Sequence, residues 1–151
     1  LYSLNIVILR IFSTYGSGLK RQIFYDLIDK FINNENIILK GNGTESRDFI
    51  HIIDLCKAIE LIMNSKNDPL EIFNIGSGEE TTIEEIATKF AYFINSSKRI
   101  KYDLEKNEGM PLNWKADITK LKKIGFNKSI EFSNGLKDYI NWYKNEKKIY
   151  E

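Results

Sequence analysis

Arg47 is the side chain whose neighbours in the sequence suggest the most specific chemistry. It comes shortly after the glycine turn 41–43, beside Asp48 and ahead of an apolar stretch. A guanidinium in such a place can hold a phosphate through two parallel charge-assisted hydrogen bonds, each contributing about 1.5–3 kcal/mol. The alternative is an ion pair of Arg47 with Asp48 or Asp54 that only holds the loop. The residues by themselves leave both interpretations open.

Two tyrosines stand four positions before a lysine, the spacing at which a helix lets an ammonium group lower the pKa of a tyrosine hydroxyl and turn it into a base. Tyr102 and Lys106 fall where a predicted strand runs into a loop, so their side chains are not expected to face each other. Tyr143 and Lys147 lie in a lysine-rich terminal helix, where core packing and solvated charge explain both residues. We therefore predict that neither pair is catalytic.

The counts of histidine and cysteine narrow the chemistry further. His51 is the only histidine and Cys56 the only cysteine. These counts exclude an internal disulfide framework, a multi-cysteine zinc site and a two-histidine metal motif, and they give no spacing that supports a Ser/His/Asp triad. We expect no metal site and no catalytic residue in the chain. Cys56 lies in an apolar helical pattern, which predicts that it packs in the core.

Composition restricts the partners. The chain has 151 residues, of which 42% are hydrophobic and 13% aromatic, and this apolar content excludes a disordered chain. A net charge of +1 provides no electrostatic drive toward nucleic acid or anionic lipid. The longest apolar run, residues 6–9, is far shorter than the roughly 20 residues that span a bilayer. We therefore expect no nucleic-acid partner, no membrane association and a cytoplasmic location.

The elements that must position Arg47 alternate between strand and helix patterns. Strands are predicted at residues 5–12, 37–40, 71–75 and 99–104, with 47–53 extended. Helices are predicted over residues 23–32, after Asp54 as N-cap, after the capping-box pattern 81–85, after Asp117, and around 136–143. Strand, glycine turn and helix in repetition indicate an α/β fold with a parallel element.

Three Gly-x-Gly turns, at residues 16–18, 41–43 and 76–78, punctuate this pattern. None continues to the third glycine of the dinucleotide-binding fingerprint, and each alone is typical of an ordinary tight turn. Two of them close strands. Because ligands of open α/β sheets bind beyond the carboxyl ends of the strands, the turns together suggest a ligand crevice.

Four blocks in order resemble the NAD-dependent sugar-nucleotide epimerases and dehydratases, the extended short-chain dehydrogenase/reductases that include UDP-glucose 4-epimerase-like enzymes. Arg10-Ile11-Phe12-Ser13-Thr14-Tyr15-Gly16 is similar to the family's Arg-x-Phe-Asn-x-x-Gly segment. Residues 41–54 resemble its glycine turn followed by Arg-Asp-aromatic-Ile-His-x-x-Asp. Residues 73–78 resemble the strand before its Thr-Ile-x-Glu helix, and residues 116–143 follow its closing order.

The resemblance covers the C-terminal half of the family. It implies the C-terminal portion of a Rossmann-type doubly wound fold, a late parallel strand followed by a small mixed α/β substrate-binding lobe. Residues 1–18 would end the NAD-binding sheet and residues 19–151 would form mainly the lobe. Since the family's glycine fingerprint and Tyr-x-x-x-Lys pair are not in the sequence, which opens on Leu1, we interpret the chain as a fragment that begins after the catalytic helix and is inactive alone.

Site residues follow from the same resemblance. The loop beside the nicotinamide of NAD and the sugar would be formed by Ile11, Phe12, Ser13 and Thr14, with Ser13 in place of an asparagine that contacts the substrate. Substrate contacts are further implied for Lys20, Gln22, Ile23, Leu39, Lys40, Arg47 and Asn107. Within that set Leu39 and Lys40 would lie along the nucleotide base and Arg47 on the diphosphate. Asn107 stands where many members have a second phosphate-binding arginine, and its neutral amide cannot supply that charge.

The function that the resemblance implies is to position a nucleotide-diphosphate sugar for hydride transfer at sugar C4 in an NAD-dependent epimerase or dehydratase, most of the NAD being bound by the other half. The full-length protein would be a homodimer. A non-catalytic module that binds a nucleotide sugar or a partner protein is the alternative, because the chain lacks every catalytic residue of the family.

Overall fold

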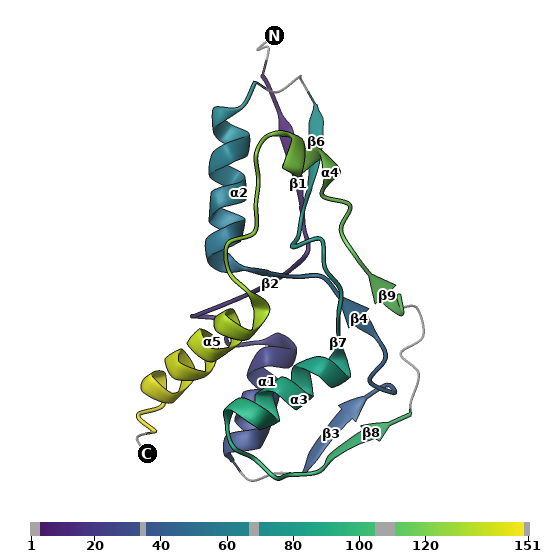
Figure 1. Ribbon diagram of the computed structural model, residues 1–151, viewed down its shortest axis with the longest axis vertical. Coiled ribbons are helices and arrows are strands. Elements are labelled where there is room, and N and C mark those ends of the chain that lie inside the picture. Colours follow the sequence, from purple (N-terminus) through teal and green to yellow (C-terminus); the bar gives the residue numbers. More distant parts are fainter. Residues whose placement is uncertain (1–3, 34–35, 67–69, 105–110, 150–151) are drawn as a thin grey trace.

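The computed structural model describes residues 4–33, 36–66, 70–104 and 111–149. The molecule is elongated. At each end a pair of strands packs against helices, and short strands lie between the two ends (Figure 1). The elements in chain order are β1 Val7–Ile11, β2 Ser13–Tyr15, α1 Gln22–Ile32, β3 Ile37–Lys40, β4 Ser46–Arg47, β5 Phe49–His51, α2 Ile52–Asn64, β6 Glu71–Ile75, β7 Thr81–Thr82, α3 Ile83–Phe93, β8 Ile100–Asp103, β9 Asn113–Trp114, α4 Thr119–Lys123 and α5 Phe132–Glu146.

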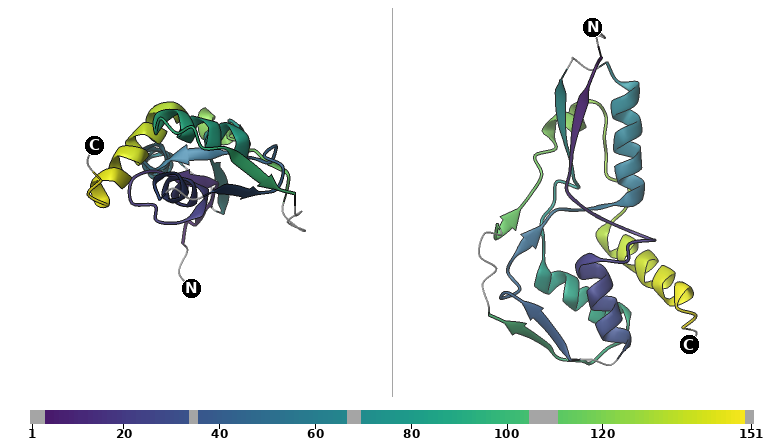
Figure 2. Two further views of the ribbon diagram at one scale, coloured as in Figure 1. Left: turned by 90° about the horizontal axis from the view of Figure 1, so that it is seen from below. Right: turned by 180° about the vertical axis from the view of Figure 1, so that it is seen from behind.

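Parallel strand pairs dominate both ends, as the alternating pattern predicts. β1 runs parallel to β6 from Val7 opposite Glu71 to Ile11 opposite Ile75, and α2 covers this pair (Figure 2). At the other end β3 runs parallel to β8. The α/β fold class is therefore confirmed. The strand predicted over 5–12 is shorter than expected, because the chain leaves β1 at Phe12 and forms a second short strand, β2, parallel to β5.

The stretch predicted as extended over 47–53 ends earlier than expected. It forms β4 and β5, and α2 begins at Ile52. His51 rather than Asp54 caps α2: its Nδ1 accepts the backbone N–H of Ile53 at 3.3 Å. The prediction of Asp54 as N-cap was wrong, because its carboxylate accepts the backbone N–H of Ile130, far along the chain, at 2.9 Å.

The capping-box prediction for α3 is confirmed. The side chain of Thr82 accepts the N–H of Glu85 at 3.1 Å, and the Glu85 carboxylate accepts the N–H of Thr82 at 2.9 Å. This reciprocal pair satisfies two donors that a helix start otherwise leaves unpaired. Before α4, the Asp117 carboxylate accepts the N–H of Thr119 at 2.9 Å, although Ile118 is the residue at the cap position.

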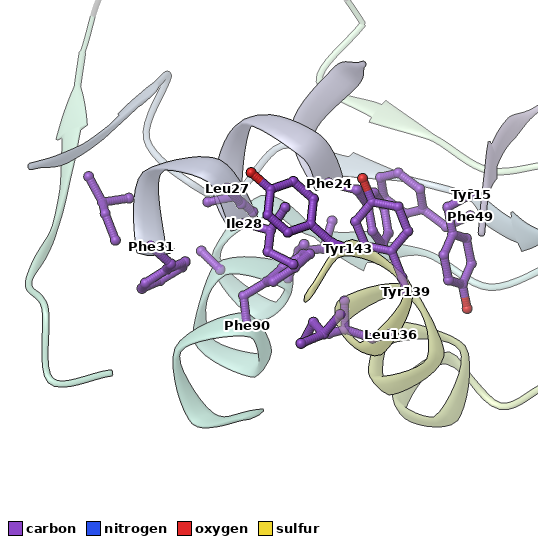
Figure 3. Packing of buried hydrophobic residues seen from close by; sticks show 14 of the residues in the cluster. Tyr15, Phe24, Leu27, Ile28, Phe31, Phe49, Phe90, Leu136, Tyr139 and Tyr143 are labelled. Carbon is purple, nitrogen blue, oxygen red and sulfur yellow. The ribbon is translucent and has the colours of Figure 1, made fainter. Parts of the chain in front are cut away.

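Two hydrophobic cores hold the molecule. The larger joins α1, α3 and α5 through stacked and edge-to-face aromatic rings, with Phe24 in contact with Tyr15, Phe49, Phe90 and Tyr139 (Figure 3). The smaller fills the space between α2, α4 and the β1–β6 pair. Each core is formed by segments that are far apart in the sequence. The boundary at residue 18, between the end of an NAD-binding sheet and the substrate-binding lobe, stays a prediction.

Cys56 corrects another prediction, since it is exposed. α2 buries Leu55, Ala58 and Ile62 against the β1–β6 pair. Cys56 is one residue, about 100°, further round the helix from Leu55. The apolar residues of α2 are too many to fit one face, so those on the outer side, with Met63 78% exposed, remain in solvent.

Candidate functional site

A pocket of about 870 Å³ lies between α1, β3 and the segment that leads into β4, the strand that carries Arg47. Its walls are mostly apolar, with charged side chains at intervals, which is the usual composition of a small-molecule site. The residues that line it are Ile23, Asp26, Lys30, Ile38, Leu39, Lys40, Gly41, Asn42, Glu45, Arg47, Ile83, Leu104, Pro111 and Leu112. We call it the large pocket.

Arg47 is held at the wall of the large pocket by backbone carbonyls. Its Nη1 donates to the carbonyl oxygen of Ser46 at 2.6 Å and to that of Leu112 at 3.2 Å. Among the described residues no carboxylate forms an ion pair with it, so the alternative of a pair with Asp48 or Asp54 is not found. These hydrogen bonds of the guanidinium therefore go to neutral carbonyl oxygens and not to a carboxylate.

The glycine turn before Arg47 is built around Glu45. The Glu45 carboxylate accepts the N–H groups of Asn42 at 3.1 Å and Gly43 at 3.0 Å. Burial acts to raise the pKa of Glu45, but these hydrogen bonds and the nearby charge of Arg47 outweigh it and lower the pKa. A Cβ at Gly41, whose φ is +86°, would lie 2.1 Å from the Glu45 Oε1. Only glycine leaves room for this carboxylate.

Four of the predicted substrate contacts come together at the large pocket, namely Ile23, Leu39, Lys40 and Arg47. Sequence reasoning missed Asp26 and Lys30, which line the same wall. A signal was available, since residues 23, 26 and 30 follow the i, i+3, i+7 spacing of one helix face. Lys30 also reaches β3, where its Nζ donates to the carbonyl oxygen of Ile38 at 3.1 Å.

A second pocket of about 450 Å³ lies along the loop after β1. The predicted cofactor-binding residues line it together with Gln22: the set is Ile11, Phe12, Ser13 and Thr14. Gly16, with φ +141°, also lines this pocket, and a Cβ there would lie 2.6 Å from Cγ2 of Ile52. Gln22 has a φ of +64°, an uncommon conformation for a residue other than glycine, and such strain is often found at binding sites. We call this second pocket the loop pocket.

One predicted contact, Lys20, lies away from both pockets. The Lys20 ammonium forms an ion pair with Glu146 at the end of α5, and Lys20 lines neither pocket. Asn107, with its neighbour Lys106, lies outside the described residues.

The environment of the tyrosines agrees with their rejection as bases. Tyr143 is buried, its hydroxyl donates to Asp29, and burial followed by that contact raises its pKa. Lys147 approaches the ring of Tyr143 and not its oxygen, with Nζ 5.7 Å from the centroid. Burial likewise raises the pKa of Tyr102. A base needs a lowered tyrosine pKa, and both shifts run in the opposite direction.

Other chemistry is not evident in the described ranges, which contain no group of three metal-ligating side chains. Nor is any helix within these ranges both long enough and apolar enough to cross a bilayer.

Comparison with known proteins identifies the family. Residues 1–76 match the model of the NAD dependent epimerase/dehydratase family, so the chain belongs to it. A curated relative, the UDP-N-acetyl-alpha-D-glucosaminuronate decarboxylase of Bacillus cytotoxicus, is 32% identical over 155 residues, covering 95% of this chain and 48% of that protein. The chain spans about half the length of the curated relatives it matches.

Solved structures match the fold over almost the whole chain. UDP-glucuronic acid 4-epimerase from Bacillus cereus, in complex with UDP-glucuronic acid and NAD, has a TM-score of 0.87 at 27% identity, over 95% of this chain and 46% of that one. UDP-N-acetylglucosamine 4-epimerase from Methanobrevibacter ruminantium M1, in complex with UDP-N-acetylmuramic acid, has a TM-score of 0.84 at 26% identity, over 95% and 47%.

Proposed function

We propose that this chain binds a nucleoside-diphosphate sugar in the large pocket and positions the sugar for hydride transfer at C4 in an NAD-dependent epimerase or dehydratase. The observation that carries the proposal is Arg47, a guanidinium at the pocket wall whose hydrogen bonds go to neutral carbonyls. A diphosphate beside it would gain charge-assisted hydrogen bonds without first breaking an ion pair.

The remaining walls suit the rest of such a ligand. Ile38, which is 50% exposed, offers an apolar surface at the pocket on which a nucleobase can lie, with Leu39 and Lys40 next to it in β3. Across the pocket, α1 presents the carboxylate of Asp26, an acceptor suited to sugar hydroxyls or base N–H groups. Because Lys20 is paired with Glu146, we place the α1 side of the large pocket on Ile23 and Asp26, and Gln22 in the loop pocket.

The loop pocket fits one end of NAD better than the whole molecule. It combines the hydroxyls of Ser13 and Thr14 with the apolar Ile11 and Phe12, a lining suited to a neutral nicotinamide amide. Arg21 is its one charged lining residue in the described part of the chain. NAD supplies the hydride acceptor when bound, and these residues would hold its ring against the sugar.

Calorimetric titration of the chain with UDP-glucose, dTDP-glucose and GDP-mannose tests the proposal. We expect binding of at least one of them, and Arg47→Ala to weaken it by on the order of 10- to 100-fold, the effect of losing one hydrogen bond to a charged group. Arg99→Ala is the matched control, because Arg99 is exposed before β8 and lines neither pocket. Unchanged affinity in Arg47→Ala, or no binding of any of the three, would overturn the proposal.

A further inference from the structure

The carboxylate of Asp48 is buried and is surrounded by hydrogen-bond donors from two other segments. Its Oδ1 accepts the backbone N–H of Ser77 at 2.6 Å and the hydroxyl of Ser77 at 2.8 Å. Its Oδ2 accepts the N–H of Gly78 at 2.9 Å and that of Ala116 at 3.1 Å. Asp48 is 1% exposed, and no cation pairs with it among the described residues.

The main chain of Asp48 makes a further link. Its carbonyl oxygen accepts the N–H of Ser13 at 3.1 Å, where β2 begins in the loop pocket. Arg47, the preceding residue, lines the large pocket. One residue therefore joins the proposed diphosphate contact, the proposed nicotinamide loop, the 76–78 turn and the segment that leads to α4.

We propose that Asp48 is a positioning residue that holds Arg47 and Ser13 at a set separation, so that a nucleotide sugar in the large pocket faces the nicotinamide ring in the loop pocket. The four hydrogen bonds that the Asp48 carboxylate accepts fix its orientation. β4 is only two residues long and pairs with β7 and β9, which are equally short, so the Asp48 contacts add to the pairing that holds the Arg47 backbone. The inference rests on the proposed function and adds a residue that does not itself touch the ligand.

Asp54 provides a matched control within the same chain. It is also fully buried, and its carboxylate accepts the hydroxyl of Ser129 at 2.6 Å and the N–H of Ile130 at 2.9 Å. These partners lie before α5 and line neither pocket. A loss of stability alone should therefore appear in variants of both aspartates, whereas a loss of alignment should appear only in variants of Asp48.

The experiment compares Asp48→Asn with Asp54→Asn. An asparagine keeps one acceptor and turns an NH₂ toward groups that are themselves donors. We expect both variants to unfold at lower denaturant concentration, and only Asp48→Asn to weaken binding of the nucleotide sugar, by about tenfold. Amide NMR spectra without ligand should show shifts at Arg47 and Ser13 in Asp48→Asn and not in Asp54→Asn. If Asp48→Asn does not fold, Ser77→Ala, which removes one donor, should give the same pattern on a smaller scale.

A double variant separates this inference from the proposed function. If Asp48 acts through Arg47, Asp48→Asn should weaken binding much less in the Arg47→Ala background than in the original chain. Equal losses in both backgrounds, or unshifted Arg47 and Ser13 amides, would overturn the positioning role while Arg47→Ala still upheld the site. If instead Arg47→Ala binds normally, the proposed function fails, and the positioning role fails with it.

Discussion

Backbone N–H groups, more than cations, satisfy three carboxylates in the described part of the chain. Asp48, Asp54 and Glu45 each accept N–H groups from a turn or loop. A carboxylate that accepts two or three such bonds is stabilised in its charged form without a partner that could compete for a ligand. Arg47 in turn forms no ion pair with these carboxylates and donates to backbone carbonyls at the wall of the large pocket.

Gly76 lies next to the Asp48 carboxylate, and the four hydrogen bonds to that carboxylate, which we call the Asp48 network, need a residue without a side chain there. A Cβ there would lie 2.6 Å from the Cβ of Ala116 and 2.8 Å from Oδ2 of Asp48. We expect Gly76→Ala to lower the free energy of unfolding by about 1–3 kcal/mol, the usual range for overpacking, and to weaken nucleotide-sugar binding as Asp48→Asn does. Chemical denaturation and calorimetry measure the two effects.

Gly125→Ala is the control for Gly76→Ala. Gly125 has a φ of +96°, and a Cβ added there would meet no atom within 4 Å. Alanine at this position therefore adds backbone strain of about 1–2 kcal/mol without touching the Asp48 network. Wild-type affinity in Gly76→Ala would show that the network does not control the site.

At the scale of elements, α2 and α3 each begin with a side chain that caps the helix. α3 begins with a complete capping box, whereas α2 begins with the ring of His51, an uncommon N-cap. The Nδ1 of His51 can accept the N–H of Ile53 only while it carries no proton. The start of α2 is therefore sensitive to pH in a way that the start of α3 is not.

The pKa of His51 gives a prediction for stability against pH. Burial lowers it, against the partly opposing charges of Asp54 and Asp138. The unfolded chain, with the ordinary pKa of 6.5, thus binds the proton more tightly than the folded chain does. As the pH falls through 6.5 toward the lower folded value, the unfolded state gains, so this contribution to stability is present above pH 6.5 and lost below it.

His51→Asn keeps a good N-cap acceptor and removes the titration. Denaturant unfolding at several pH values between 8 and 5 should show a shallower loss of stability for His51→Asn than for the original chain. Parallel curves would contradict the role of His51, since all the other titratable groups are common to both proteins.

At the scale of the whole molecule, the β1–β6 end carries apolar surface that the described residues do not cover. Ile6, Ile8 and Ile11 are 47%, 45% and 49% exposed, and β1 is paired only with β6 within the described ranges. An apolar strand with an open edge can pair with another chain. We predict low solubility and self-association of the 151-residue chain.

Ile8→Lys tests this prediction, because a charge on an edge strand opposes pairing between chains. We expect a larger soluble fraction and a smaller weight-average mass in sedimentation than for the original chain. Met63→Lys, which adds the same charge on the exposed face of α2, should change neither quantity as much. A sharp, cooperative melt of a monomer by the original chain would contradict the prediction.

The sequence by itself determined the elements whose signals are local. The helices α1 and α3, the strands β3 and β6 and the glycine turns follow from periodicity, capping pairs and breakers, all properties of neighbouring residues. The order of motifs also indicated the family. These features need no knowledge of distant contacts.

Only the tertiary structure decided which distant groups meet. Asp54 looked like a helix cap and instead binds Ile130, Cys56 looked like core and is exposed, and Lys20 lies on Glu146 outside both pockets. Asp26 entered the large pocket because α1 packs beside β3. In each case the surroundings of the residue are set by another element. Which elements meet depends on how the two cores pack, and the pattern of neighbouring residues does not contain that information.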